Sequence, residues 1–304
     1  MATTGDNKSW TTLELLNWTA DYFGRLGLEN ARLNAEVLLG KVLGVERIML
    51  YARFDQEVGE RQREEFRALV RRRAAREPLQ YLVGRWEFYG RPFELSPAVL
   101  IPRQETELLV EKCLEKSTGT GLWCADVGTG SGAVAVTLAA ERPTLNVIAT
   151  DVSDAALEVA ARNARAHGVS ERVHTVRGEL AEPVLGLLPP GRAGLDLLAS
   201  NPPYVPSARI AALAPEVRDY EPRQALDGGP DGLDVLRRLV PAAAGVLLPR
   251  GWMALELGEE QAGPVRRMVE QTRAFDVSSI QIVTDAGGCQ RVFCVRRLAP
   301  EGEH

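Results

Sequence analysis

The segment "SNPPYVP", residues 200–206, combines an amide, two prolines and a phenol directly after the apolar run "GLDLLA". Pro202 and Pro203 carry no backbone N–H, and each holds the preceding residue in an extended conformation. Asn201 and Tyr204 flank them with a polar side chain and an aromatic ring. The segment therefore predicts a stiff turn at a strand end that offers acceptors rather than donors, unless it serves only as a rigid strand exit.

A glycine-rich turn, "DVGTGSG" at residues 126–132, lies between an expected strand and the apolar helix "AVAVTLAAE". Gly128, Gly130 and Gly132 let the backbone pass close beneath a ligand without a side-chain collision. The first turn of the following helix has free N–H groups that suit a negative group. Dinucleotide sites use a similar turn, so this stretch alone does not identify the ligand.

Two acids follow the next two expected strands. Asp151 ends "NVIATD", where a carboxylate can accept hydrogen bonds from a ribose diol. The alternative is a helix cap, although Asp154 is the better candidate for that position. Glu179, in "RGEL", either accepts a hydrogen bond from an adenine amino group or is only exposed to solvent.

A parallel sheet is expected to position these residues. Short apolar strands alternate with helices, which indicates a doubly wound α/β sheet covered on both faces. The segments "FDVSSIQIV" and "RVFCVRR" are joined by "TDAGGCQ", which is too short for a crossover helix, so this last pair must be antiparallel. The parallel strands are expected at 122–128, 146–151, 172–178, 195–200 and 251–258.

The N-terminal part has helical periodicity instead. "TTLE" at 11–14 is a capping-box pattern, and two longer helical runs follow it. The tract "RRRAAR" predicts a solvated face, or else a contact with RNA or an acidic partner. The aromatic, Gly- and Pro-containing stretch that follows predicts a β-hairpin. We therefore expect a helical domain at 1–78, a hairpin linker at 79–103 and an α/β domain at 104–304.

Composition excludes several classes of protein. Of 304 residues, 45% are hydrophobic and 25% are charged, as in ordinary globular proteins. No apolar run approaches the ~20 residues of a membrane span, and no secretory signal is expected. The net charge of −5 argues against a general nucleic-acid binder. The four cysteines are scattered without a nearby histidine, so we expect no metal site and a cytoplasmic location.

The sequence also argues against a dehydrogenase and a serine hydrolase. The three histidines are His167, His174 and His304, of which the first two fall at a helix end and in a strand. A dehydrogenase would need an acid–base group near its carbonyl substrate, and a serine hydrolase would need a nucleophile elbow. What remains is a nucleoside pocket whose fourth strand ends in N-P-P-Y.

The glycine-rich turn, the two acids and N-P-P-Y, in this order on consecutive strands, resemble the S-adenosylmethionine-dependent N-methyltransferases. Within that group, "LQYLVGRWEFYGRPFELSPAVLIPRQETELLVE", "YEPRQALDGGPDGL" and "LELG" resemble the release-factor glutamine methyltransferases, the HemK/PrmC family. The resemblance spans about residues 10 to 298. It departs from the family pattern at Gln104, where P-D/E-T-E is usual, and at Glu179, where the usual residue is Asp.

The resemblance implies a Rossmann-like, mostly parallel seven-stranded sheet with an antiparallel last strand. It implies methyl transfer from S-adenosylmethionine to the side-chain nitrogen N5 of the glutamine in the Gly-Gly-Gln motif of peptide chain release factors, a step in translation termination. The Asn201 oxygen and the Pro202 carbonyl, aimed by Pro203, would accept the two amide hydrogens, and Tyr204 would offer an aromatic face. The implied cofactor-binding residues are Gly128, Thr129, Gly130, Ser131, Gly132, Asp151, Glu179 and Asn201, with Leu180 beside the adenine.

Three other readings stay open. A ribosomal-protein glutamine methyltransferase would share this site, and an N6-adenine methyltransferase would use the same acceptor pair on a flipped base. An inactive, cofactor-binding adaptor is the third. The release-factor reading needs no direct contact with nucleic acid, membrane or metal, and we expect a monomer.

Overall fold

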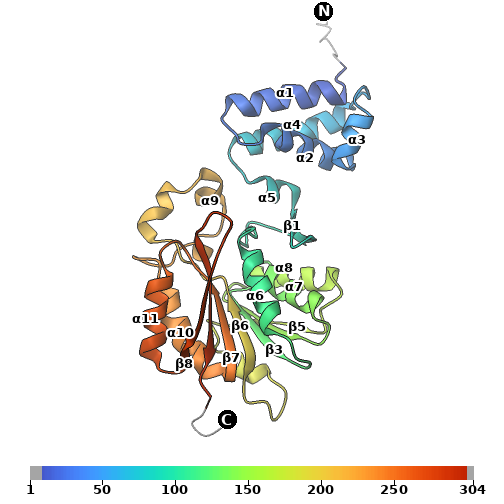
Figure 1. Cartoon of the computed structure of the whole chain (residues 1–304). Coiled ribbons are helices and arrows are strands. Elements are labelled where there is room, and N and C mark those ends of the chain that lie inside the picture. The colour runs from blue at the N-terminus through green and yellow to red at the C-terminus, as the bar shows by residue number, and fades with distance from the viewer. Residues whose placement is uncertain (1–8, 300–304) are drawn as a thin grey trace, which may run out of the picture. The chain divides into compact units, whose positions relative to one another are not determined.

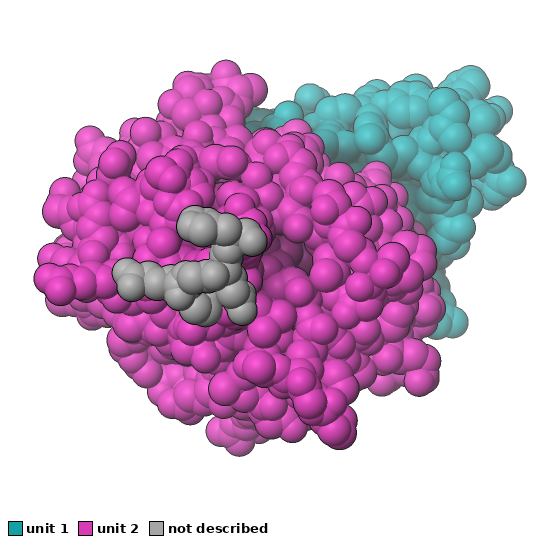
Figure 2. Space-filling view, turned by 60° about the horizontal axis from the view of Figure 1, so that its bottom comes forward, with its two compact units in different colours: residues 1–84, 215–220 teal, residues 85–214, 221–304 magenta. Residues whose placement is uncertain are grey.

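The computed structural model describes residues 9–299, which fall into two compact units. The helical unit comprises residues 1–84 together with 215–220, and the sheet unit comprises 85–214 and 221–304. Figure 2 colours the helical unit teal and the sheet unit magenta. A six-residue segment from late in the chain therefore belongs to the N-terminal unit.

The helical unit begins with the capping box expected from "TTLE". The Glu14 N–H donates to Thr11 Oγ1 at 3.3 Å, and the Thr11 N–H donates to Glu14 Oε2 at 2.9 Å, which confirms the prediction. Leu16, Phe23 and Leu38 are fully buried in the core of this unit. Its helices are α1 (Thr12–Arg25), α2 (Ala31–Leu43), α3 (Arg47–Ala52), α4 (Glu60–Ala74), α5 (Leu79–Val83) and α9 (Pro215–Tyr220).

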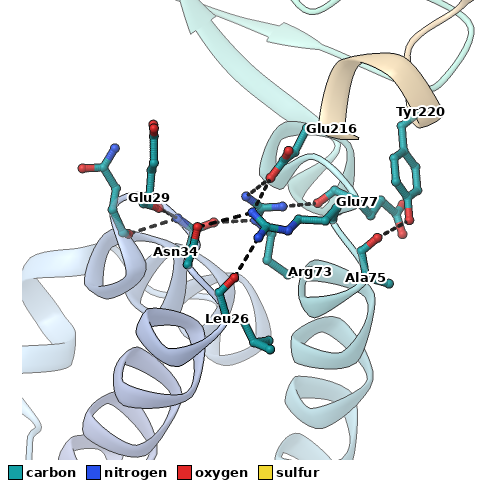
Figure 3. Close-up of polar contacts among 11 residues, drawn as sticks. Leu26, Glu29, Asn34, Arg73, Ala75, Glu77, Glu216 and Tyr220 are labelled. Carbon is teal, nitrogen blue, oxygen red and sulfur yellow. Dashed lines mark hydrogen bonds and ion pairs between the residues drawn. The ribbon is translucent and has the colours of Figure 1, made fainter. Parts of the chain in front are cut away.

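The arginine tract at the end of α4 is partly internal, so the expected solvated or partner-binding face is wrong for Arg73. The Arg73 side chain is 8% exposed and donates to Asn34 Oδ1 at 2.7 Å, the Glu77 carbonyl at 3.0 Å and Glu216 Oε1 at 3.1 Å (Figure 3). The Tyr220 hydroxyl donates to the Ala75 carbonyl at 2.7 Å. Acceptors from distant parts of the sequence thus surround Arg73, and α9 is bound to α4 and the residues after it.

The hairpin is shorter than the sequence suggested. Its strands are β1 (Arg85–Phe88) and β2 (Arg91–Glu94), joined by Tyr89 and Gly90, which both have positive φ (51° and 67°). Such a two-residue connection matches the twist of the paired strands. The preceding residues form α5, because Leu79, Tyr81 and Leu82 are buried and Gly84 ends the helix in the left-handed conformation.

The sheet unit is a doubly wound, mostly parallel sheet of seven strands, as expected. The strand order is β5-β4-β3-β6-β7-β9-β8, and β9 runs antiparallel to both β7 and β8. Its position between those two strands was not predicted, and β7 begins earlier than expected. The strands are β3 (Trp123–Val127), β4 (Asn146–Asp151), β5 (Val173–Arg177), β6 (Leu195–Ser200), β7 (Leu247–Glu256), β8 (Phe275–Thr284) and β9 (Gln290–Arg297).

Helices cover both faces of this sheet (Figure 1). The apolar side chains of α10 and α11 pack on one face and those of α6, α7 and α8 on the other, with Ala125 and Val127 in the first core and Cys124 in the second. The helices are α6 (Thr106–Lys116), α7 (Ala133–Glu141), α8 (Asp154–Ala166), α10 (Asp234–Val246) and α11 (Ala262–Thr272). None of the helices within residues 9–299 is long and apolar enough to span a membrane.

The strand order reverses next to β3. From β3 the chain continues to β4 and β5 on one side, and then returns to place β6 and β7 on the other. In open α/β sheets a crevice forms at the carboxyl ends of the strands at such a point. The fold therefore places the glycine-rich turn and the N-P-P-Y segment at the same crevice.

Candidate functional site

A cavity of about 350 Å³ opens at the carboxyl ends of the strands, within the sheet unit. The segments that follow four neighbouring strands line it, together with part of the loop before α10 and the chain before α6. The strand-end segments are 128–131, 151–153, 178–180 and 200–203. The structure thus brings together most of the residues that the sequence singled out.

The buried Asp126, which the sequence analysis did not single out, fixes the glycine-rich turn by hydrogen bonds. Asp126 Oδ2 accepts from the Thr129 hydroxyl at 2.6 Å and from the Ala135 N–H at 3.1 Å. Burial raises the pKa of Asp126 to about 6, and the hydrogen bonds from Thr129 and Ala135 oppose that rise. The signal available in the sequence was an acid at the start of "DVGTGSG" in an otherwise apolar strand.

The three glycines of the turn have two different structural roles. Gly128 and Gly130 line the cavity with φ of +75° and +55°, and a Cβ on either would meet no atom within 4 Å. Both leave open space for a ligand above the turn. Gly132 does not line the cavity, and a Cβ there would lie 3.1 Å from Ala160 of α8. Its lack of a side chain serves helix packing.

Asp151 lies at the cavity, with its carboxylate oriented by the backbone. Oδ2 accepts from the Gly130 N–H at 2.9 Å, and Oδ1 accepts from the Ser153 N–H at 3.0 Å. Each oxygen keeps a further lone pair for a ligand. Ser153 is the cap of α8, since its hydroxyl accepts from the Ala156 N–H, so the expected cap at Asp154 is wrong.

Glu179 lines the cavity and forms an ion pair with Arg238. Its Oε1 lies 2.6 Å from Nη2 of Arg238, a residue of α10 that the sequence analysis did not foresee, and its side chain is 48% exposed. Leu180 also lines the cavity, with a positive φ of 53°, and its carbonyl accepts from the Thr150 hydroxyl at 3.0 Å. The backbone of Leu180 is therefore fixed by β4.

The first three residues of the N-P-P-Y segment face the cavity, whereas Tyr204 faces the buried Glu256. Asn201, Pro202 and Pro203 line the cavity, and Asn201 Nδ2 donates to Thr106 Oγ1 at 3.2 Å, which leaves the amide oxygen for another donor. Tyr204 does not line the cavity, and its hydroxyl donates to Glu256 Oε1 at 3.3 Å. Burial raises the pKa of Tyr204, and the Glu256 charge adds to the rise.

Gln104, at which the chain departs from the family pattern, does not line the cavity. Gln104 is exposed in the turn before α6, where its carbonyl accepts from the Glu107 N–H at 3.0 Å. Two residues later, Thr106 is buried and faces Asn201. Among residues 9–299 the hydrogen bond found at Gln104 uses its backbone carbonyl, so glutamine at this position leaves the Thr106 contact intact.

Comparison with known proteins identifies the family to which the chain belongs. A model of the PrmC N-terminal domain matches residues 14–84, and one of the methyltransferase small domain matches residues 104–215. The release factor glutamine methyltransferase of Geobacter sulfurreducens is 45% identical over 93% of this chain and 95% of its own length. The chain belongs to the release factor glutamine methyltransferase family. The Moorella thermoacetica relative of the same name is 45% identical over 89% of this chain and 93% of its own length.

A solved structure supports the methyltransferase fold of the chain. The hMettl16 catalytic domain in complex with the MAT2A 3′UTR hairpin 6 matches with a TM-score of 0.54 at 15% identity, over 70% of this chain and 77% of that one. At that identity the likeness concerns the fold alone. The family resemblance drawn from the motifs is confirmed, and the chain is a methyltransferase.

Proposed function

We propose that this chain transfers a methyl group from S-adenosylmethionine to N5 of the glutamine in the Gly-Gly-Gln motif of peptide chain release factors. The observation that carries this is the 45% identity to the Geobacter sulfurreducens relative over 93% of the chain. The match extends through the helical unit as well as the sheet unit. It therefore favours the same class of protein substrate over a ribosomal protein or a nucleic acid.

The residues around the cavity fit S-adenosylmethionine, which supplies an activated methyl group when bound. The open space above Gly128 and Gly130 and the pre-oriented carboxylate of Asp151 support this assignment. We propose that the turn at 128–132 holds the cofactor, with Thr129 and Ser131 contributing from the same turn. Asp151 accepts from the ribose hydroxyls. Glu179 accepts from the adenine amino group, with Leu180 against the ring.

The Asn201 side chain has the orientation that an acceptor for the substrate amide needs. Its nitrogen donates to Thr106, so its oxygen can accept one amide hydrogen of the substrate glutamine. The Pro202 carbonyl accepts the other, aimed by Pro203. Two acceptors draw electron density onto the amide nitrogen and stabilise the positive charge that develops on it. Positioning for in-line attack supplies much of the remaining acceleration, so no strong base is needed. Tyr204 does not line the cavity, so the aromatic contact with the substrate amide that the resemblance implied for it is not part of this proposal.

The helical unit supplies recognition of the release factor in this proposal. Ile48 and Tyr51 of α3 and Phe54 just after it are spaced three residues apart, with exposures of 68%, 45% and 51%. Large apolar side chains spaced in this way form a surface suited to a protein partner. We also propose that the division into domains at 1–78, 79–103 and 104–304 reflects separate recognition and catalysis, and that the protein acts as a cytoplasmic monomer.

Methylation of intact substrates tests the activity. The enzyme is incubated with S-adenosylmethionine and a folded release factor, and the modified peptide is located by mass spectrometry. We expect one methyl group on the Gly-Gly-Gln glutamine and none when that glutamine is replaced by alanine. A higher kcat/KM on a ribosomal protein, or methylation of DNA or RNA, would contradict the proposal.

A second measurement tests the helical unit. Ile48→Asp and Phe54→Asp should raise KM for the folded release factor and leave turnover of a short Gly-Gly-Gln peptide unchanged. Val277→Asp serves as the matched control, because Val277 is 36% exposed on β8 in the sheet unit. Unchanged KM in both the Ile48 and the Phe54 variant would show that recognition lies elsewhere.

A further inference from the structure

Glu256 is a buried acid beside the N-P-P-Y segment to which the reaction described above gives no role. Strands β6 and β7 are parallel neighbours, with Ser200 opposite Leu255, so Asn201, just after β6, and Glu256, the last residue of β7, reach the same level of the sheet. Glu256 is 1% exposed. A carboxyl group so placed loses its hydration and needs hydrogen-bond donors.

Two hydroxyl groups surround this carboxyl. The Tyr204 hydroxyl donates to Oε1 at 3.3 Å, whereas Oε2 is buried without a partner among residues 9–299. Burial raises the pKa of Glu256 to about 7, and hydrogen bonding from Thr106 and Tyr204 opposes the rise. No hydrogen bond to Oε2 meets ordinary geometry among the described residues, and the buried Thr106 hydroxyl, whose hydrogen bonding lowers the pKa of Glu256, is the donor that we assign to this oxygen.

The direction of these hydrogen bonds follows from what each group can offer. An ionised carboxylate only accepts, so it takes the single hydrogen of the Thr106 hydroxyl. The Thr106 oxygen can then only accept from Asn201, which must turn its Nδ2 toward Thr106, as observed at 3.2 Å. The Asn201 oxygen is consequently the atom left for the substrate.

We propose that Glu256 is a positioning residue for methyl transfer, which fixes Asn201 through Thr106 so that the amide oxygen, and not the amide nitrogen, faces the substrate. This rests on the acceptor role of Asn201 in the proposed function. Glu256 holds Tyr204 through the same carboxyl. One buried acid therefore sets the two polar ends of N-P-P-Y and touches neither substrate nor cofactor.

Protonation of Glu256 removes this constraint. A neutral carboxyl can donate, and the Thr106 hydroxyl is then free to donate to the Asn201 oxygen, which allows the asparagine amide to turn over. The charged groups that act on Glu256 are Glu105 before α6, which raises its pKa, and Arg291 on β9, which lowers it. Turnover should accordingly increase as pH rises through about 7.

Substitutions at both ends of the contact test the proposal. Glu256→Gln and Thr106→Val keep the side-chain volume, and each should lower kcat on the folded release factor about 10- to 100-fold, the range for one lost hydrogen bond to a charged group. Cofactor affinity and the melting temperature should change little. The double variant should be no slower than the slower single variant, since both break one chain of contacts. Thr106→Ser keeps the hydroxyl and should restore most of the turnover.

A matched threonine separates this role from packing. Thr137 of α7 is fully buried and its hydroxyl has no partner among the described residues, so Thr137→Val should leave kcat unchanged. The pH profile of kcat gives an independent readout. Wild-type enzyme should show a rise centred near pH 7, and Glu256→Gln should lack it.

The outcomes distinguish this inference from the proposed function. If the wild-type enzyme does not methylate the release factor, the proposed function is wrong and the inference falls with it. If wild-type turnover is normal but Glu256→Gln stays within twofold or keeps the rise near pH 7, only the role of Glu256 is overturned. Additive losses in the double variant would also overturn it.

Discussion

Arg73→Met is expected to destabilise the helical unit strongly although the residue lies in a surface-type arginine tract. Methionine keeps an apolar stem but removes three donors, so Asn34 Oδ1 and the Glu77 carbonyl lose the guanidinium and Glu216 keeps only Arg76, at 3.5 Å. Breaking a buried ion pair from one side costs about 3–5 kcal/mol. Because Glu216 is 22% exposed and retains one partner, we expect about 2–3 kcal/mol.

Arg72→Met is the matched control on the same turn of α4. Arg72 pairs with Glu77 at 2.5 Å, but its side chain is 54% exposed, so the loss should stay below about 1 kcal/mol. Native-state hydrogen exchange measured by mass spectrometry reports the opening free energy of α2, α4 and α9 separately from the sheet unit. Equal, small losses for the two variants would refute the internal role of Arg73.

Three further predictions concern the sheet unit. Asp151→Ala should weaken S-adenosylmethionine binding by about 1–3 kcal/mol through lost charge-assisted hydrogen bonds, and calorimetry showing unchanged affinity would remove Asp151 from the site. Asn201→Ala should slow methyl transfer about 30- to 1,000-fold, whereas Asn201→Asp keeps an acceptor and should retain more activity, and near-wild-type rates in both would contradict the acceptor role. The pKa of Asp126 rises from 3.8 to about 6 on folding, so its contribution to stability is full below about pH 4 and is lost as pH rises toward 6. Asp126→Asn should remove that decline, on the order of 2–3 kcal/mol, which urea unfolding at pH 4 to 7 would detect as a changed difference from wild type.

Features encoded locally were predictable from the sequence. The limits of β4 and β6 agree with the expected strands, because each is a short apolar run that ends in a polar residue at the edge of the sheet. The capping box needs only Thr11 and Glu14, three residues apart. The cavity-lining positions Asp151 and Asn201 were found for the same reason, since carboxyl ends of parallel strands meet at one edge.

Features that depend on distant segments were not predictable. Arg73 looked like part of a solvated tract because its acceptors come from residues 34, 77 and 216. Thr106 and Glu256 lie in stretches that carry the family resemblance, but their relation to Asn201 follows from the pairing of β6 with β7 and the position of α6. The insertion of β9 between β7 and β8 likewise depends on the tertiary fold.

The membership of α9 in the helical unit makes the peptide chain itself a link between the N-terminal helices and the cavity. Pro203 and Pro222 both line the cavity, and the chain between them leaves to place Glu216 against Arg73 and returns. Unfolding of the N-terminal helices would release that excursion as one long unanchored loop, and closing such a loop costs entropy. Cofactor affinity and the stability of the N-terminal helices should therefore be thermodynamically linked, and an enzyme shortened by its first 77 residues would bind cofactor less tightly despite keeping every cavity-lining side chain.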